Sequence, residues 1–329
     1  MKKRLLGKTG FEIFEIGTGT WQVGGKWGSV FSHNNADTIL NTAIDNGVNF
    51  IDTADVYSDG ESEKAVGRLV RSRKERIYVA TKCGRRLSPH TDKSYQTPEL
   101  RRFVEDSLKN MGLEIIDLIQ LHCPPTETFY RPEIFEFFST LKKEGKILNL
   151  GVSVEKIDEA LKAIEYENVT TVQIIFNMLR QRPSEQFFAD AARKNIGIIA
   201  RVPLASGLLT GKFTSSTTFG KEDHRMFNRN GEAFDKGETF SGVDYTKGLR
   251  AVEEIKKLFP QHQNLTALAL KWILMFQEVS CVIPGASSPD QVHLSISASD
   301  LPNLSLEQMN SIKQIYDQYI WPDLAKEKW

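Results

Sequence analysis

The chain has 329 residues, of which 40% are hydrophobic and 26% are charged, and these fractions are ordinary for a soluble globular protein. Its formal net charge is zero and no long run of one sign occurs, which argues against a nucleic-acid surface or a polybasic membrane patch. No segment approaches the about 18 apolar residues of a membrane span. The basic start is followed by Gly7-Lys8-Thr9-Gly10 rather than by the apolar stretch of a signal peptide. Three sparse cysteines fit a reducing cytoplasm.

Short apolar runs of strand length alternate along the chain with longer segments of helical period. The expected strands are Phe14–Thr18, Asn49–Thr53, Ile77–Lys82, Leu118–His122, Leu148–Ser153, Val172–Phe176, Gly197–Val202 and Ser280–Pro284. The expected helices between them are Ala36–Asn46, Ser62–Val70, Pro98–Met111, Pro132–Glu144, Val154–Tyr166, Ser184–Lys194, Tyr245–Phe259 and Leu265–Phe276.

Eight strands that alternate with helices predict a (β/α)₈ TIM barrel, an α/β fold. The strand runs are apolar on both faces, as expected for parallel strands covered by helices. The remaining segments predict an N-terminal hairpin over Lys3–Ile13, a long polar loop over Phe213–Asp244 and an extra C-terminal helix over Ser305–Tyr319. Because no linker divides the chain, we expect one domain over residues 1–329. A doubly wound sheet of similar rhythm is the alternative.

Three titratable residues stand at the ends of expected strands, and a tyrosine follows the first of them. Asp52, Lys82 and His122 end three successive runs, and Tyr57 lies a few residues after Asp52. Barrel enzymes place their chemistry at these strand ends. A lysine that faces a carboxylate keeps its charge and lowers the pKa of a neighbouring tyrosine, which predicts that Tyr57 is a general acid. His122 can donate a hydrogen bond to a carbonyl oxygen, and a cofactor would have to supply the hydride.

Simpler explanations of these residues remain open. Asp52 and Lys82 can form a structural ion pair, and Tyr57 can serve only in packing. Lys82 can also act as the Schiff-base lysine of a barrel aldolase. A zinc site is disfavoured, because Cys83, His122 and Cys123 lack the spacings that zinc ligands show.

Two segments suit the phosphates of a cofactor, although neither is specific alone. Residues 17–22 do not fit the Rossmann glycine pattern, because Gln22 stands where its last glycine should be. The segment 203–212 is a loop of small residues that ends in Lys212, and barrels often bind phosphate after strands 7 and 8. Residues 283–290 lead into the start of a helix, where anions bind readily.

Taken together, these segments resemble the aldo-keto reductase family over nearly the whole chain. The resemblance rests on four motifs in the right order: Gly17-Thr18-Gly19-Thr20-Trp21, Asn49-Phe50-Ile51-Asp52-Thr53-Ala54-Asp55-Val56-Tyr57 with Gly60-Glu61-Ser62-Glu63, Ala80-Thr81-Lys82, and Asp117-Leu118-Ile119-Gln120-Leu121-His122. Gly151-Val152-Ser153, Gln173 and the 203–212 loop match the cofactor segments of the family.

The resemblance implies an NAD(P)H-dependent reductase of small aldehydes or ketones, in which Tyr57 donates the proton, Lys82 and Asp52 tune it, and His122 orients the carbonyl. It also implies a set of cofactor-binding residues, with Ser153 and Gln173 on the nicotinamide carboxamide and Ser206, Leu208 and Lys212 on the pyrophosphate. That set is Gly19, Thr20, Trp21, Asp52, Ser153, Gln173, Arg201, Pro203, Leu204, Ser206, Leu208, Lys212, Gly285, Ser287, Gln291 and Ser295.

The chain departs from the family pattern at several cofactor positions. Arg201 replaces an aromatic residue that stacks on the nicotinamide, and its planar guanidinium can stack instead. Ser287 and Ser295 stand where members that bind the 2′-phosphate offer more suitable side chains, and Val154 replaces a common asparagine. The resemblance favours NADP(H), whereas these departures leave NAD(H) possible. A non-catalytic nicotinamide-binding regulator, similar to the potassium-channel β-subunits, is the alternative function, and the sequence defines neither the substrate nor the oligomeric state.

Overall fold

Eight parallel strands curl into a barrel in the computed structural model, which describes residues 1–25, 30–262, 264–327 and 329. The strands are neighbours in chain order, and the first and last meet through parallel bridges from Ile16 to Val282 and from Gly19 to Gly285. The barrel is therefore confirmed over the doubly wound alternative. Its strands are β3 (Thr18–Gly19), β4 (Phe50–Asp52), β5 (Tyr78–Cys83), β6 (Ile116–His122), β7 (Ile147–Ser153), β8 (Val169–Ile175), β9 (Gly197–Arg201) and β10 (Val279–Val282).

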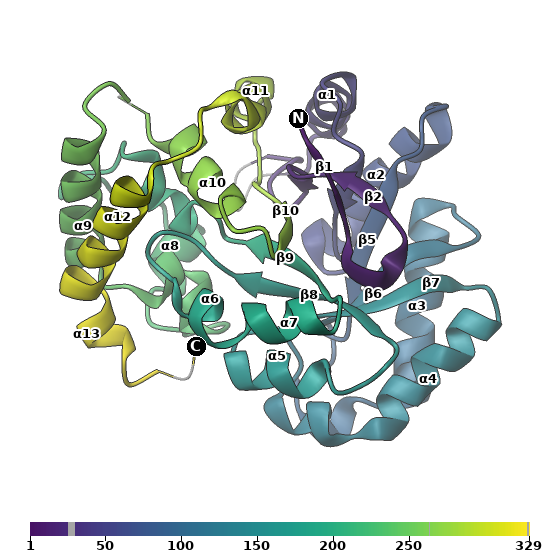
Figure 1. Ribbon diagram of the computed structural model, residues 1–329. Helices are drawn as coiled ribbons and strands as arrows, with labels where there is room; N and C mark the ends of the chain where they lie inside the picture. Colours follow the sequence, from purple (N-terminus) through teal and green to yellow (C-terminus); the bar gives the residue numbers. More distant parts are fainter. Residues whose placement is uncertain (26–29, 263, 328) are drawn as a thin grey trace.

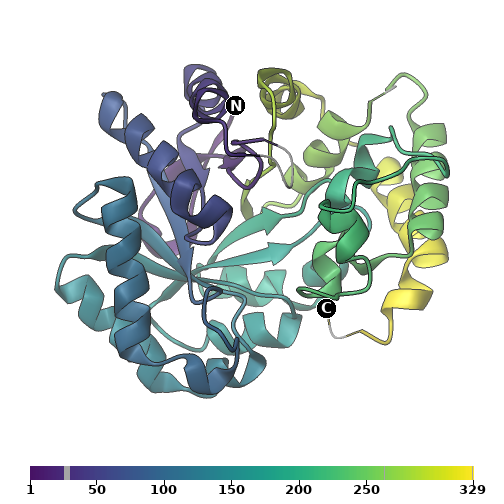
Figure 2. The ribbon, with the colours of Figure 1, turned by 180° about the vertical axis from the view of Figure 1, so that it is seen from behind.

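Helices surround the strands (Figure 1), and a second group lies beyond them at one side of the molecule in both ribbon views (Figures 1 and 2). No helix among the described residues is both long and apolar enough to cross a membrane. The surrounding helices are α1 (His33–Asp45), α2 (Glu61–Ser72), α3 (Thr97–Met111), α4 (Pro132–Lys143), α5 (Ile157–Ala163), α6 (Arg182–Gln186), α7 (Phe188–Arg193), α10 (Thr266–Leu274) and α11 (Pro289–Ile296). The outer group consists of α9 (Tyr245–Leu258), α12 (Leu306–Tyr319) and α13 (Trp321–Leu324).

Both additions predicted at the chain ends are present. The hairpin consists of β1 (Lys3–Leu5) and β2 (Glu12–Phe14), and α12 begins with a capping box in which the Ser305 side chain accepts from the Gln308 amide. That residues 1–329 form a single domain stays a prediction.

Several predicted elements are wrong in their bounds, among them one strand and two helices. Phe14 belongs to the hairpin, and β3 is shifted to Thr18–Gly19, because the Phe14 backbone already pairs with Lys3. The helix expected from Val154 begins only at Ile157. The helix expected over Ser184–Lys194 is divided into α6 and α7 at Phe187, whose side chain is fully buried. Tertiary packing has overridden the local helical pattern at this residue.

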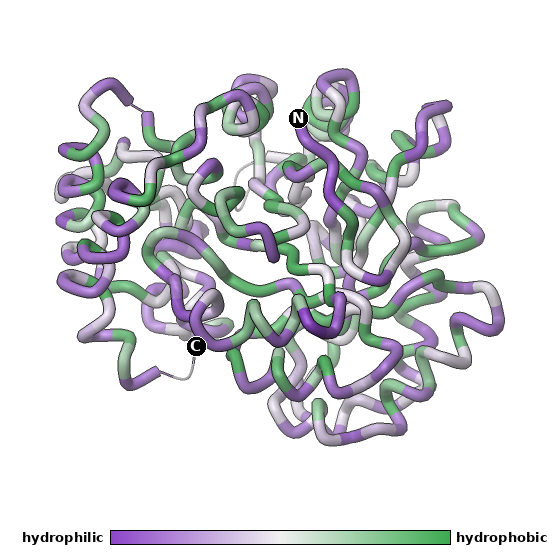
Figure 3. Tube along the Cα trace, in the orientation of Figure 1, coloured by the Kyte–Doolittle hydropathy of each residue, from purple (hydrophilic) through white to green (hydrophobic). Residues whose placement is uncertain are grey.

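Two apolar cores hold the barrel together, and hydrophobic residues gather along the central strands (Figure 3). The larger core lies between the strands and the surrounding helices. The smaller core fills the interior, where Leu6 and Ile13 of the hairpin region pack against Phe50, Leu118 and Ile199 of the strands. The hairpin therefore closes one end of the barrel, which leaves the other end for a site.

Candidate active site

The side chains of the site project inward because side chains alternate along each strand. Phe50, Ala80 and Leu118 lie in the interior core, so the residues two places further along β4, β5 and β6 also face inward. These residues are Asp52, Lys82 and Gln120, and Gln173 of β8 joins them. A polar layer therefore lies directly above the apolar layer, at the carboxyl ends of the strands.

Lys82 is the buried centre of this layer. Its ammonium donates hydrogen bonds to Asp52 Oδ2 at 2.6 Å, to the Thr53 carbonyl oxygen at 2.8 Å and to Tyr57 Oη at 3.3 Å. Burial acts to lower the pKa of Lys82, but the Asp52 carboxylate opposes it and the pKa stands above its ordinary value. The amine is therefore charged and its protons are engaged, which disfavours the Schiff-base role.

Asp52 is held from its other side by two buried amides. Gln173 Nε2 donates to Asp52 Oδ1 at 2.7 Å and Gln120 Nε2 donates to the same oxygen at 3.1 Å. These bonds fix the carboxylate that faces Lys82. Gln120 was not among the predicted site residues, although a glutamine inside a buried strand is a signal that the sequence contains.

Tyr57 lies at the mouth of the barrel, with its ring edge-on to His122 at a centroid distance of 6.1 Å. Burial raises the pKa of Tyr57 above its ordinary value, and the Lys82 charge only partly offsets this effect. The prediction that Lys82 would bring this pKa toward neutral pH is therefore wrong in its net direction. The hydroxyl stays protonated at neutral pH, which is the form that a proton donor needs.

His122 is neutral. Burial lowers its pKa well below the ordinary value, and the nearby charges of Lys82, Arg85 and Arg201 add to the effect. Within the part of the chain that the structure describes, its Nδ1 atom is buried without a hydrogen-bond partner. A neutral imidazole can donate one hydrogen bond to an uncharged carbonyl oxygen.

A cavity of about 580 Å³ opens at this end of the barrel, and its size is typical of ligand sites. Most of the predicted residues line it: Gly19, Thr20, Trp21, Asp52, Tyr57, His122, Gln173, Arg201, Pro203, Leu204, Ser206, Lys212, Gly285, Gln291 and Ser295. Lys82, Ser153, Leu208 and Ser287 do not. Ser153 is buried against Cys123, and the Leu208 side chain is buried in the core, so neither side chain faces the cavity.

The cavity wall after β9 suits a dinucleotide phosphate. Lys212 and Arg225 bring two positive charges to it, beside Ser206 and Gly207. Ser206 and Gly207 have φ angles of 55° and 100°, a left-handed backbone that often marks ligand-binding turns. Gln291, at the beginning of α11, also lines the cavity, and its Oε1 atom accepts from the Ser287 amide at 2.8 Å. These residues fit a nicotinamide dinucleotide.

The segment 213–244 was expected to be a long polar loop, and in the structure it is a packed segment that contributes to the cavity wall. It contains the short helix α8 (His224–Phe227), and the His224 ring lies 4.9 Å from the Trp21 ring across the barrel mouth. The buried Asn228 side chain accepts from the amides of Ala233 and Phe234 and holds the segment together. The segment adds His224, Arg225, Phe234 and Glu238 to the cavity wall.

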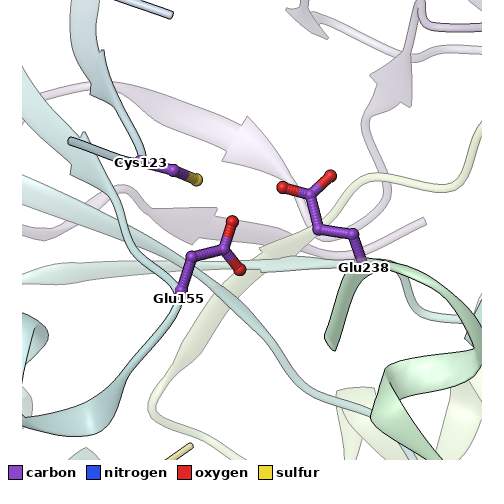
Figure 4. Close-up of side chains that lie close together, drawn as sticks. All are labelled: Cys123, Glu155 and Glu238. Atoms are coloured by element: carbon purple, nitrogen blue, oxygen red, sulfur yellow. The ribbon is translucent and has the colours of Figure 1, made fainter. Parts of the chain in front are cut away.

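A cluster of charged side chains lies beside His122 and was missed in the sequence. The carboxyl groups of Glu155 and Glu238 and the thiol of Cys123 face one another (Figure 4). One oxygen of each carboxyl group and the Cys123 sulfur all lie within 4.8 Å of one another. Arg201 Nη2 donates to Glu155 Oε2 at 2.8 Å and Arg201 Nη1 lies 3.7 Å from Glu238 Oε1. Because the Arg201 guanidinium already lies against both carboxyl groups, we describe the cluster as an ion network and not as a metal site. It also engages Arg201, whose guanidinium the sequence offered as a replacement for the aromatic residue that stacks on the nicotinamide.

Comparison with known proteins agrees with this geometry. Residues 15–317 match the Aldo/keto reductase family. A Bacillus subtilis (strain 168) protein named uncharacterized oxidoreductase YqkF is 29% identical over 324 residues, which cover 98% of each chain. An Escherichia coli (strain K12) protein named NADH-specific methylglyoxal reductase is 31% identical over 93% of this chain and 95% of its own. The structure of the glycerol dehydrogenase AKR11B4 from Gluconobacter oxydans is similar with a TM-score of 0.77, at 27% identity over 97% of this chain and 96% of its own.

These matches span nearly the whole chain and show that the barrel is that of an oxidoreductase. The chain belongs to the Aldo/keto reductase family. The resemblance to this family, which rested on four sequence motifs, is therefore confirmed.

Proposed function

We propose that the protein reduces an aldehyde or ketone to an alcohol with NAD(P)H, and that Tyr57 donates the proton. The observation that carries the proposal is the contact of Tyr57 with the buried Lys82–Asp52 pair at the edge of the cavity. The cavity is of a size for small molecules, which supports a small carbonyl compound as the substrate.

Each residue has a distinct part in this reaction. The carbonyl oxygen would lie between Tyr57 and His122, where the neutral imidazole orients it and the phenol gives it a proton. The charged Lys82 would stabilise the phenolate that remains, and Asp52 would keep Lys82 charged and in place. A bound nicotinamide dinucleotide supplies the hydride.

The cofactor would lie along the wall formed by Ser206, Lys212 and Arg225 and reach Gln291 at the beginning of α11. Gln173 would contribute near the nicotinamide, although its amide also donates to Asp52. NADP(H) is favoured by the two cations, and NAD(H) is possible because the sequence from Gly285 to Ser295 contains neither arginine nor lysine. The free, buried thiols of Cys83, Cys123 and Cys281 support a reducing, cytoplasmic location.

The test is a screen for the oxidation of NADPH and NADH with a panel of aldehydes, ketones and quinones. We expect turnover of at least one class of substrate, and we expect Tyr57→Phe to abolish this turnover. Cofactor binding without turnover of any member of the panel would instead favour the non-catalytic nicotinamide-binding regulator.

A further inference from the structure

Arg85 is a charged residue of the cavity wall that the reaction above does not use. It follows β5 by two residues and lines the same cavity as Tyr57 and His122. Its side chain is about one fifth exposed, whereas that of Arg201 is half as exposed. The guanidinium therefore borders the space in which the substrate would lie.

The contacts of Arg85 within the protein are loose. Its Nη1 atom lies 3.8 Å from Glu155 Oε1 and its Nη2 atom lies 3.6 Å from Glu238 Oε1. Both distances exceed those of hydrogen bonds, and within the described chain no N–H group of Arg85 donates one. The adjacent Arg86 differs, because it donates to Asp59 Oδ1 at 3.1 Å outside the cavity.

Arg201 differs from Arg85 in that its guanidinium donates hydrogen bonds within the protein. It belongs to the same ion network, yet it donates to Glu155 Oε2 at 2.8 Å and to the Val154 carbonyl oxygen at 3.0 Å. The Oε2 atom of Glu155 is thus bonded to Arg201, whereas its Oε1 atom, which lies nearest Arg85, has no hydrogen-bond partner among the described residues. Arg85 keeps a planar array of donors that matches a carboxylate or a phosphate.

The charge of the network also favours an incoming anion. Burial raises the pKa of Glu238 to about 8, and the neighbouring Glu155 carboxylate adds to the effect. Glu155 stays ionised, because the Arg201 charge lowers its pKa in spite of burial. Glu238 therefore opposes an incoming anion less than a freely ionised carboxylate would, while Arg85 and Arg201 both keep their charge.

We propose that Arg85 binds an oxyanion on the substrate, so that the preferred substrates are carbonyl compounds that carry a carboxylate or a phosphate group. The proposal rests on the proposed carbonyl reduction. Tyr57 and His122 would bind the carbonyl end, and Arg85 would bind the anionic end through paired N–H donors. Phe234, whose ring lies 5.8 Å from the guanidinium carbon, would cover the opposite side of Arg85.

The first experiment compares kcat/KM for matched anionic and neutral aldehydes. One pair is 4-oxobutanoate and its methyl ester, and the other is glycolaldehyde phosphate and glycolaldehyde. We expect the wild-type protein to prefer the anionic member of at least one pair by about 10- to 100-fold, the effect of a charged hydrogen bond. Arg85→Gln should remove the preference through KM, and Arg85→Lys should restore part of it. Arg86→Gln is the matched control and should keep the preference.

The second experiment measures binding alone, so that it does not depend on turnover. Isothermal titration with succinate and with glycolate 2-phosphate should give binding that Arg85→Gln weakens about tenfold or more and Arg86→Gln does not. Saturating NADP⁺ during the titration should keep these anions from the cations Lys212 and Arg225. Circular dichroism of each variant checks its folding.

The two substrate pairs distinguish a carboxylate from a phosphate as the anionic group of the substrate. A preference in the first pair alone assigns oxo acids, and one in the second pair alone assigns phosphorylated aldehydes. Reduction of neutral aldehydes without any anionic preference, together with equal anion binding by wild type and Arg85→Gln, would overturn the inference and leave carbonyl reduction standing. Anion binding through Arg85 without turnover of any aldehyde would instead leave the subsite standing and contradict the reductase proposal.

Discussion

The Lys82 ammonium donates a hydrogen bond to the Tyr57 hydroxyl oxygen at 3.3 Å, and the same nitrogen lies 4.9 Å from the centre of the Tyr57 ring. The positive charge is therefore held beside the phenol by a residue that is itself fixed by Asp52 and the Thr53 carbonyl. In the proposed reaction, burial would keep the phenol protonated until the oxyanion of the substrate forms, and the Lys82 charge would stabilise the phenolate afterwards.

Tyr57→Phe should abolish reduction and leave cofactor binding nearly intact. In the proposed reaction the phenol donates the proton, and such general acid catalysis contributes about 10²- to 10⁴-fold in rate. The measurement is kcat with saturating cofactor, together with the Kd of the cofactor by fluorescence titration. Tyr130→Phe is a suitable control because Tyr130 is exposed and does not line the cavity. Retention of more than about a tenth of the wild-type rate, with chemistry rate-limiting, would remove Tyr57 from the acid role.

Lys82→Met should inactivate the enzyme by a different route and also destabilise the fold. The substitution leaves the buried Asp52 carboxylate without its cation, and breaking a buried pair in this way costs about 3–5 kcal/mol. The measurements are turnover and the urea midpoint. Double replacement with Asp52→Asn should recover stability and not activity. A covalent adduct on wild-type Lys82 after borohydride treatment with substrate would support an aldolase in place of the reductase.

Asp55→Asn should stabilise the protein at and above neutral pH. Both carboxylate oxygens of Asp55 are buried and lack a hydrogen-bond partner among the described residues. Burial raises the pKa of Asp55 to about 7, and Glu63 adds to the effect, whereas an unfolded aspartate titrates near about 3.9. The folded state alone keeps the proton between these two values, so stability falls as pH rises through this window.

Urea unfolding from pH 4 to pH 8 measures this effect. The free energy of unfolding of Asp55→Asn should exceed that of the wild type by an amount that grows from pH 4 to pH 7 and then levels off. This growth should reach up to about 1.4 kcal/mol for each unit of the pKa shift. Asp59→Asn is the matched control, because the Asp59 side chain is largely exposed, and its stability difference should not grow in this way. A difference for Asp55→Asn that is constant with pH would contradict the buried, protonated carboxyl group.

Discrimination between NADPH and NADH should be weak, below about 100-fold or about 2.7 kcal/mol. The sequence from Gly285 to Ser295 has no arginine or lysine, and its Ser287 and Gln291 bond to each other. Arg225 is held by Asp223 beside Ser206, and Arg229 donates to the Arg225 carbonyl oxygen. Dissociation constants for both cofactors decide the matter. A larger preference would show that a cation reaches the 2′-phosphate when the cofactor binds.

Hydrogen exchange in residues 213–244 should slow when NADPH binds. Arg225 and Glu238 of this segment line the cavity, and His224 contacts Trp21 across its mouth. A bound cofactor beneath the segment should reduce its local opening. Exchange measured by mass spectrometry should show the effect here and not in α4 on the outside of the barrel. Equal exchange with and without cofactor would show that the segment does not cover the cofactor.

Local sequence patterns determined most of the barrel and its central polar layer. Short apolar runs predicted that Asp52 and Lys82 lie at the ends of buried strands, and neighbouring parallel strands bring such ends together. The family motifs around Tyr57 and His122 added the remaining members. These features depend on short-range periodicity, which a single sequence displays directly.

Only the tertiary structure decided which distant side chains meet around that layer. Glu155 follows β7, Glu238 lies in the 213–244 segment and Arg85 follows β5, and no local pattern connects them. The net pKa of Tyr57 was decided in the same way, because burial depends on everything that packs around the phenol whereas the sequence showed only the adjacent charge. The ordered packing of residues 213–244 likewise arises from contacts with Trp21 and among its own aromatic rings. Long-range contacts and the loss of solvent are properties of the folded chain, and periodicity along the sequence does not contain them.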